Sequence, residues 1–89
     1  MIYYTNTKLN HPHLMFGGRW SPFHEGHSAI IQKKRKEFPK LPVLIMVRDT
    51  MVEPFPVAIR AEQIKQWMLH NRVSGTIMII PNIQGIYWG

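Results

Sequence analysis

The stretch LMFGGRWSPFHEGH, residues 14–27, decides the fold, because it contains the end of one element and the start of another. Residues 14–17 have the length and apolar character of a short buried strand, and the glycines Gly17 and Gly18 stop it. A helix is expected to follow from Gly26 or His27 to about residue 38. The stretch therefore predicts a strand joined to a helix by a tight, glycine-containing turn.

The rest of the chain repeats this alternation. Residues 43–47 are a continuous apolar run of strand length, Pro56 suits the first position of a second helix, and residues 76–80 are typical of a third strand. This order predicts a parallel sheet with right-handed crossovers in the Rossmann style, with helices on both faces. The strands should order as third, second, first, and residues 2–4 are expected to add an edge strand.

Each helix is expected to bury one apolar face. In the first helix this face is expected from four residues, opposite the basic run at 33–36: Ala29, Ile30, Ile31 and Phe38. In the second helix, apolar residues at spacings of four, three and four form a stripe: Val57, Ala61, Ile64 and Met68, with Trp67 beside it. Both faces should pack against the sheet.

Length and composition bound the class of protein. The 89 residues fit a single small domain, residues 1–89, with residues 1–13 as an N-terminal extension. The absence of cysteine excludes a disulfide framework and a thiolate zinc site, and it agrees with a reducing cytoplasm. No apolar run is long enough to span a membrane and the start lacks the features of a signal peptide, so we expect a soluble, cytoplasmic protein.

The charge of the chain favours anionic partners. Eleven Lys and Arg against five Asp and Glu give a formal net charge of +6, which attracts nucleic acid, a nucleoside triphosphate or a phosphorylated metabolite. The basic run at 33–36 fits either the solvated last turn of a helix or a nucleic-acid patch. Because no aromatic residues are interleaved with it, nucleic acid is the less favoured partner.

The turn and helix start after the first strand carry the residues suited to chemistry. In a parallel sheet, the carboxyl end of each strand and the amino end of the next helix lie on one rim, where ligands bind. Gly17 and Gly18 leave the backbone accessible, and His24 and His27 can direct two imidazoles at one anion at the helix N-terminus. Gly26 leaves the space between them open. Fixed N–H donors of this kind stabilise the charge that develops on phosphate during nucleotidyl transfer.

The same residue types also fit roles without nucleotide chemistry. The sequence His-Glu-Gly-His superficially resembles the zinc-binding helix motif, but that motif needs histidines four apart and a third ligand. The two histidines could also be incidental residues of a helix start. Arg48 and Asp49, on the same rim, are either substrate contacts or loop caps. Arg60 is either a phosphate ligand or a surface arginine in an ion pair.

The sequence GRWSPFHEGH, residues 18–27, resembles the signature of the nucleotidylyltransferase superfamily (the cytidylyltransferase-like fold), whose members carry a His-x-Gly-His motif. The extended pattern is most similar to nicotinamide mononucleotide adenylyltransferases of the archaeal type and to small phage nucleotidyltransferases. Three further stretches resemble the same group: EPFP at 53–56 with Arg60, VRDT at 47–50, and IPNI at 80–83, in which Asn82 departs from the usual aspartate. The resemblance covers about residues 16–89.

This resemblance implies a Rossmann-like three-layer α/β/α fold of the adenine nucleotide alpha hydrolase-like (HUP) type, cut short after the third strand. It implies a transferase that moves AMP or CMP from ATP or CTP to a small phosphorylated acceptor and releases pyrophosphate, with Mg²⁺ accompanying the nucleotide. His24 and His27 would contact the triphosphate and stabilise the transition state. The residues implied to shape the nucleotide site are Gly17, Gly18, Arg19, Phe23, Gly26 and Arg60; Trp88 would stack on a base or belong to the core.

Members of the family are usually longer, with a further strand beside the first one. Without that strand, residues 14–17 would form an edge with unpaired N–H and C=O groups, and half of the nucleotide cleft would be missing. Residues 1–5 could fold back as a covering strand, or two copies could pair edge to edge. Alternatively, the chain is a truncated, catalytically weak nucleotide-binding remnant. We expect self-association or weak activity rather than a complete monomeric enzyme.

Overall fold

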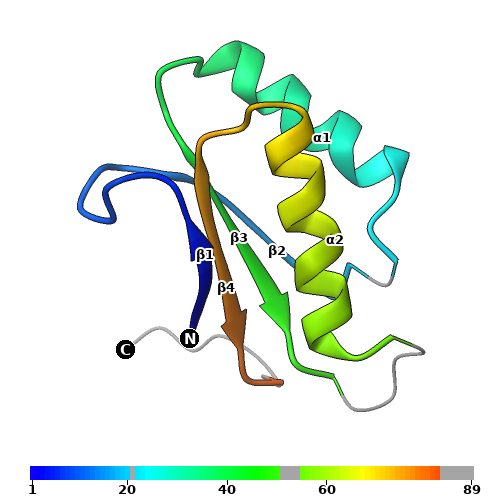
Figure 1. Ribbon diagram of the computed structural model, residues 1–89. Helices are drawn as coiled ribbons and strands as arrows, with labels where there is room; N and C mark the ends of the chain where they lie inside the picture. Colours follow the sequence, from blue (N-terminus) through cyan, green and yellow to red (C-terminus); the bar gives the residue numbers. More distant parts are fainter. Residues whose placement is uncertain (21, 51–54, 83–89) are drawn as a thin grey trace, which may run out of the picture.

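The computed structural model describes residues 1–20, 22–50 and 55–82. Six elements follow one another along the chain, as Figure 1 shows: β1 (Ile2–Thr5), β2 (Leu14–Gly18), α1 (Glu25–Glu37), β3 (Val43–Arg48), α2 (Val57–His70) and β4 (Gly75–Ile80). The predicted alternation of strands and helices is confirmed. The second helix begins at Val57, one residue later than predicted, with Pro56 as its N-cap. Within these residues no helix is long and apolar enough to cross a membrane.

The four strands form one sheet in the order β1-β4-β3-β2. The three later strands are parallel, which confirms the expected order of third, second, first. The expected N-terminal edge strand is also present, as β1, but it runs antiparallel to β4. The Asn6 side chain fixes it there, because its oxygen accepts from the Gly75 N–H at 2.8 Å and its nitrogen donates to the Val73 carbonyl at 3.1 Å. The alternative in which residues 1–5 cover the first parallel strand is therefore wrong, and β2 is an edge of the sheet among the described residues.

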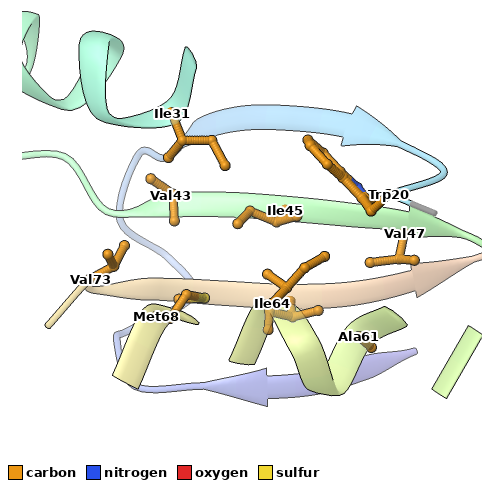
Figure 2. Close-up of a cluster of buried hydrophobic side chains, with 10 residues drawn as sticks. Trp20, Ile31, Val43, Ile45, Val47, Ala61, Ile64, Met68 and Val73 are labelled. Carbon is orange, nitrogen blue, oxygen red and sulfur yellow. The ribbon is translucent and has the colours of Figure 1, made fainter. Parts of the chain in front are cut away.

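Both helices cover the same face of the sheet. In β3, the alternate residues Val43, Ile45 and Val47 are fully buried, and alternate residues of a strand point to one face. Side chains of both helices join them in one core, as Figure 2 shows: Ile31 from α1, and Ala61, Ile64 and Met68 from α2. The described part of the chain thus has two layers, so the expected three-layer arrangement is not confirmed. The physical reason is that both crossovers are right-handed and step across the sheet in one direction.

The predicted apolar stripe of α2 is confirmed, whereas that of α1 is largely wrong. In α1 only Ile31 is buried, and Ala29 is exposed, as are Ile30 at 60% and Phe38 at 46%. The position of the helix explains this difference. Because α1 lies over β2, at the edge of the sheet, the side of the helix that extends past β2 has no strand beneath it.

Candidate active site

Helix α1 begins at Glu25, between the two histidines. His24 is its N-cap, and the His24 Nδ1 accepts a hydrogen bond from the Gly26 backbone N–H at 3.0 Å. In return, the His27 Nδ1 accepts from the His24 backbone N–H at 3.3 Å. This is a reciprocal capping box, a role that Ser or Thr and Glu or Gln usually fill. It satisfies two N–H groups that the helix itself leaves without acceptors.

The capping box also determines where each imidazole carries its hydrogen. A nitrogen that accepts a hydrogen bond cannot hold a proton, so in the neutral ring the hydrogen lies on the other nitrogen. The neutral rings of His24 and His27 therefore each have an Nε2–H donor. Their centroids are 3.8 Å apart and their planes differ by 23°. The structure thus brings together two hydrogen-bond donors at the positive end of a helix.

The ring of His27 is held by aromatic neighbours. It meets the edge of Trp20 at a centroid distance of 4.8 Å and stacks on Phe23 at 5.7 Å, with a 12° angle between the planes. Burial lowers the pKa of His27 below its ordinary value of 6.5, and positive charge on His24 lowers it further. The neutral form of His27 is therefore favoured near neutral pH.

Sequence reasoning did not find Trp20 as a structural residue of this site. Trp20 is buried, and its indole N–H donates to the Met46 carbonyl of β3 at 2.9 Å. Its backbone has φ of 56°, a left-handed conformation that is uncommon outside glycine. A β-carbon added to Gly18 would lie 3.3 Å from the Trp20 ring, so Gly18 makes room for the indole. A tryptophan within a polar, glycine-flanked loop was the available signal.

Gly26 is required by the way His24 folds over the helix start. A β-carbon at this position would lie 2.8 Å from the His24 Cε1 and 3.1 Å from its Nδ1. The first distance is shorter than real side chains allow, so any other residue would push the imidazole out of its capping position. The open space expected at Gly26 is thus occupied by the ring of His24 itself.

Arg60 lies inside the protein, beneath the rim, rather than on its exposed surface. Its side chain is fully buried and donates to three backbone carbonyls: Arg19 after β2, Arg48 at the end of β3 and Phe55 before α2. Neither predicted role, a phosphate ligand or a surface ion pair, matches this position. The spacing of three from Val57 and four from Ile64 places Arg60 on the buried stripe of α2, which was the signal for its burial.

The remaining predicted residues lie around the same rim. Arg48 donates from Nη2 to the Asn82 side-chain oxygen at 3.0 Å, so the two residues link the ends of β3 and β4. Asp49 is exposed, and its backbone N–H donates to the Ile80 carbonyl. Arg19 is exposed as well. The predicted contact Trp88, and residues 53–54 of the second motif, lie outside the described residues.

Two hollows flank the histidine pair. One, of about 420 Å³, lies between the helices and is lined by Phe23, His24, Glu25, Ser28, Gln63 and Trp67. The other, of about 380 Å³, lies along the β2 edge and is lined by Met15, Phe16, Gly17, Gly18, Trp20, His27 and Ile30. Each histidine therefore borders open space. No cluster of three or more His, Asp or Glu suited to a metal ion occurs in the parts of the chain described above.

The match to a known family spans the same elements that build this site. The model of the cytidylyltransferase-like family matches residues 15–79, well over half of the chain. The chain belongs to the cytidylyltransferase-like family. The matched region runs from β2 into β4, and it contains both histidines and Arg60 but not β1. The family suggests nucleotidyl transfer in general. No curated protein and no solved structure shows significant similarity to the chain.

Proposed function

We propose that this cytidylyltransferase-like chain transfers AMP or CMP from ATP or CTP to a small phosphorylated acceptor and releases pyrophosphate. The observation that carries the proposal is the pair of Nε2–H donors at the positive end of α1. In such a reaction, a phosphate oxygen of the acceptor attacks the α-phosphorus of the nucleotide. The bond from that phosphorus to pyrophosphate breaks, and its electron pair leaves with the pyrophosphate.

The neutral state of His27 suits this chemistry. The acceptor phosphate is already ionised near neutral pH, so no general base has to remove a proton. Negative charge instead accumulates on the oxygens of the attacked phosphorus and on the departing pyrophosphate. Donors that are held in place before the reaction stabilise this charge without reorganisation, and removing one such donor typically lowers kcat by about 10²–10³-fold. Two rings fixed by backbone hydrogen bonds fulfil this requirement.

Mg²⁺ would accompany the triphosphate. Within the described ranges no three carboxylate or imidazole groups converge on a possible metal position, so the ligands available to the ion are phosphate oxygens and water. The ion would supply neutralisation of phosphate charge. The chain itself would then bind and orient the phosphates, through His24, His27 and the first N–H groups of α1.

The test separates the chemistry of the histidines from their capping role. The double variant His24→Ser with His27→Glu creates the common Ser-x-x-Glu capping box, so the helix start should persist. It lacks both Nε2–H donors and adds negative charge. We expect a loss of pyrophosphate release from ATP or CTP of at least about 10²-fold, in the presence of Mg²⁺ and candidate phosphorylated acceptors. The charge-matched control is His11→Glu, at an exposed position distant in sequence from the site.

Two outcomes would contradict the proposal. If the double variant releases pyrophosphate at the wild-type rate, the histidines do not stabilise the transition state. If calorimetry shows that ATP or CTP binds the wild-type chain but no acceptor yields pyrophosphate, the second candidate is favoured, a nucleotide-binding protein without catalysis. Edge strand β2 is the observation that supports this second candidate, because one side of the site has no neighbouring strand in the described chain.

A further inference from the structure

We propose that the edge of β2 is the surface on which two copies of this chain associate, as antiparallel strands about a two-fold axis. The inference does not depend on the proposed function. In the described chain β2 pairs with β3 alone, so its other side carries backbone groups without a strand partner. Exposed strand edges of this kind are templates for pairing with another strand.

The register of β2 on β3 identifies the outward groups. The Leu14 N–H donates to the Pro42 carbonyl, next to its register partner Val43, so the backbone groups of Leu14 face β3. Backbone groups alternate sides along a strand, and those of Met15 and Gly17 therefore point away from the sheet. Two residues, each with one donor and one acceptor, are available to a second strand.

A two-fold axis at Phe16 satisfies all of these groups. Met15 then lies opposite Gly17 of the second copy, and the two residues exchange both of their N–H···O=C bonds, as hydrogen-bonded antiparallel pairs do. The same pair recurs on the other side of the axis. This register pairs all five residues of β2 with the second copy: Leu14 lies opposite Gly18 of that copy, and Phe16 lies opposite its own counterpart. Shifting the axis to Met15 or Gly17 leaves part of the strand unpaired.

The apolar side chains beside the edge match this arrangement. Phe16 and Ile30 line the same hollow of about 380 Å³, and the Ile30 side chain is 60% exposed. Because the axis is perpendicular to the sheet, the α1 helices of both copies lie on the same face. Each Phe16 then approaches its counterpart across a pair without hydrogen bonds, where side chains are closest. The second copy covers the open side of this hollow, which His27 also lines.

The charge of the chain does not prevent this contact. Each copy carries a formal net charge of +6, which opposes association. However, helix α1 runs antiparallel to β2, so the two-fold axis places the basic runs at 33–36 at opposite ends of the contact. Their repulsion is screened by salt over about 8–10 Å at physiological ionic strength. Association should therefore strengthen as salt concentration rises.

Sedimentation of the whole chain at several concentrations tests the proposal. We expect a dimer of about 21 kDa, twice the 10.5 kDa of one chain. The variant Ile30→Glu should shift it to monomer, because a carboxylate would face the apolar hollow. Ile59→Glu is the matched control, since Ile59 is an exposed isoleucine of α2, 48% accessible. A wild-type chain that stays monomeric, or a dimer that Ile30→Glu leaves intact, overturns the proposal.

A single-cysteine variant tests the register. The chain has no cysteine, and the Cα atoms of a residue pair without hydrogen bonds lie about 4.5 Å apart, within the range that a disulfide spans. Phe16→Cys should therefore form a covalent dimer under mild oxidation, whereas Ile59→Cys at the same concentration should not. Circular dichroism checks that both variants remain folded. A folded Phe16→Cys dimer that fails to cross-link would refute the axis at Phe16.

Discussion

Replacement of Arg60 should destabilise the protein far more than replacement of any exposed arginine. Arg60 is fully buried, and its guanidinium donates to three carbonyls: Arg19 in the β2–α1 loop, Arg48 at the end of β3, and Phe55 at the far end of the β3–α2 loop. In Arg60→Met the side chain is apolar and similar in length, but the carbonyls lose the guanidinium donors, although that of Arg48 keeps the Thr50 N–H at 3.0 Å. Each buried polar group without a partner costs about 1–3 kcal/mol, and hydrogen bonds to charged groups are worth about 1.5–3 kcal/mol.

The expected loss is smaller than the sum of these contributions. Arg60→Met also removes the cost of burying a charge, and some of the loop carbonyls regain water. We therefore expect the free energy of unfolding to decrease by about 3–4 kcal/mol. Arg60→Lys should lose about 2 kcal/mol, because one ammonium cannot reach all three carbonyls. A chain of this length has roughly 4–13 kcal/mol in total, so Arg60→Met should be close to unfolding.

Urea unfolding followed by circular dichroism measures these differences. Arg72→Met is the control, because Arg72 is exposed and surface substitutions usually change stability by less than about 0.5 kcal/mol. If Arg60→Met loses less than about 1 kcal/mol, the buried guanidinium does not hold the loops together and the reasoning fails.

The glycines and His27 allow three more predictions. Gly26→Ala should leave the melting temperature nearly unchanged, because a gain in helix propensity of about 0.5–1 kcal/mol offsets the loss of a cap worth about 1 kcal/mol. The same substitution should lower the rate of pyrophosphate release, because the added β-carbon displaces the His24 ring. Because the pKa of His27 in the folded chain is lowered from 6.5, the His27 imidazole takes up a proton at higher pH in the unfolded chain, and protonation therefore favours unfolding. In thermal melts from about pH 7 to about pH 5, the melting temperature should decrease less in His27→Gln than in wild type. Gly75→Ala should lower the urea midpoint strongly, because its β-carbon would overlap the Val43 backbone carbonyl of β3, whereas Gly17→Ala, whose β-carbon meets only a flexible methyl group at 3.5 Å, should change it little.

The order of the elements could be predicted from the sequence because its signals are local. Apolar runs at 43–47 and 76–80, ended by polar or proline residues, indicate strands whatever lies beside them. The parallel order of these strands then follows from the preference for right-handed crossovers. The position of β1 beside β4 could not be predicted, since it depends on Asn6 meeting Gly75 across most of the chain.

Burial was harder to predict than the elements themselves. The apolar residues of α1 resemble those of a fully packed helix, yet Ile30 is largely exposed because the sheet ends at β2. For Arg60 the difference is the reverse, because a side chain expected at the surface is buried. Backbone carbonyls take the place of water around its guanidinium. The proximity of His24 and His27 follows from their spacing, but which ring nitrogen each uses depends on backbone geometry at the helix start.

The position of Arg60 has a consequence for anyone who would redesign this rim. The β2–α1 loop and both ends of the β3–α2 loop are tied to one guanidinium, so the spacing between these two loops is set by a single buried side chain. Transplanting one of these loops from a homologous protein would change a carbonyl position to which the other loop is also adjusted. Such grafts should succeed only when the arginine and both loops are exchanged together as a unit.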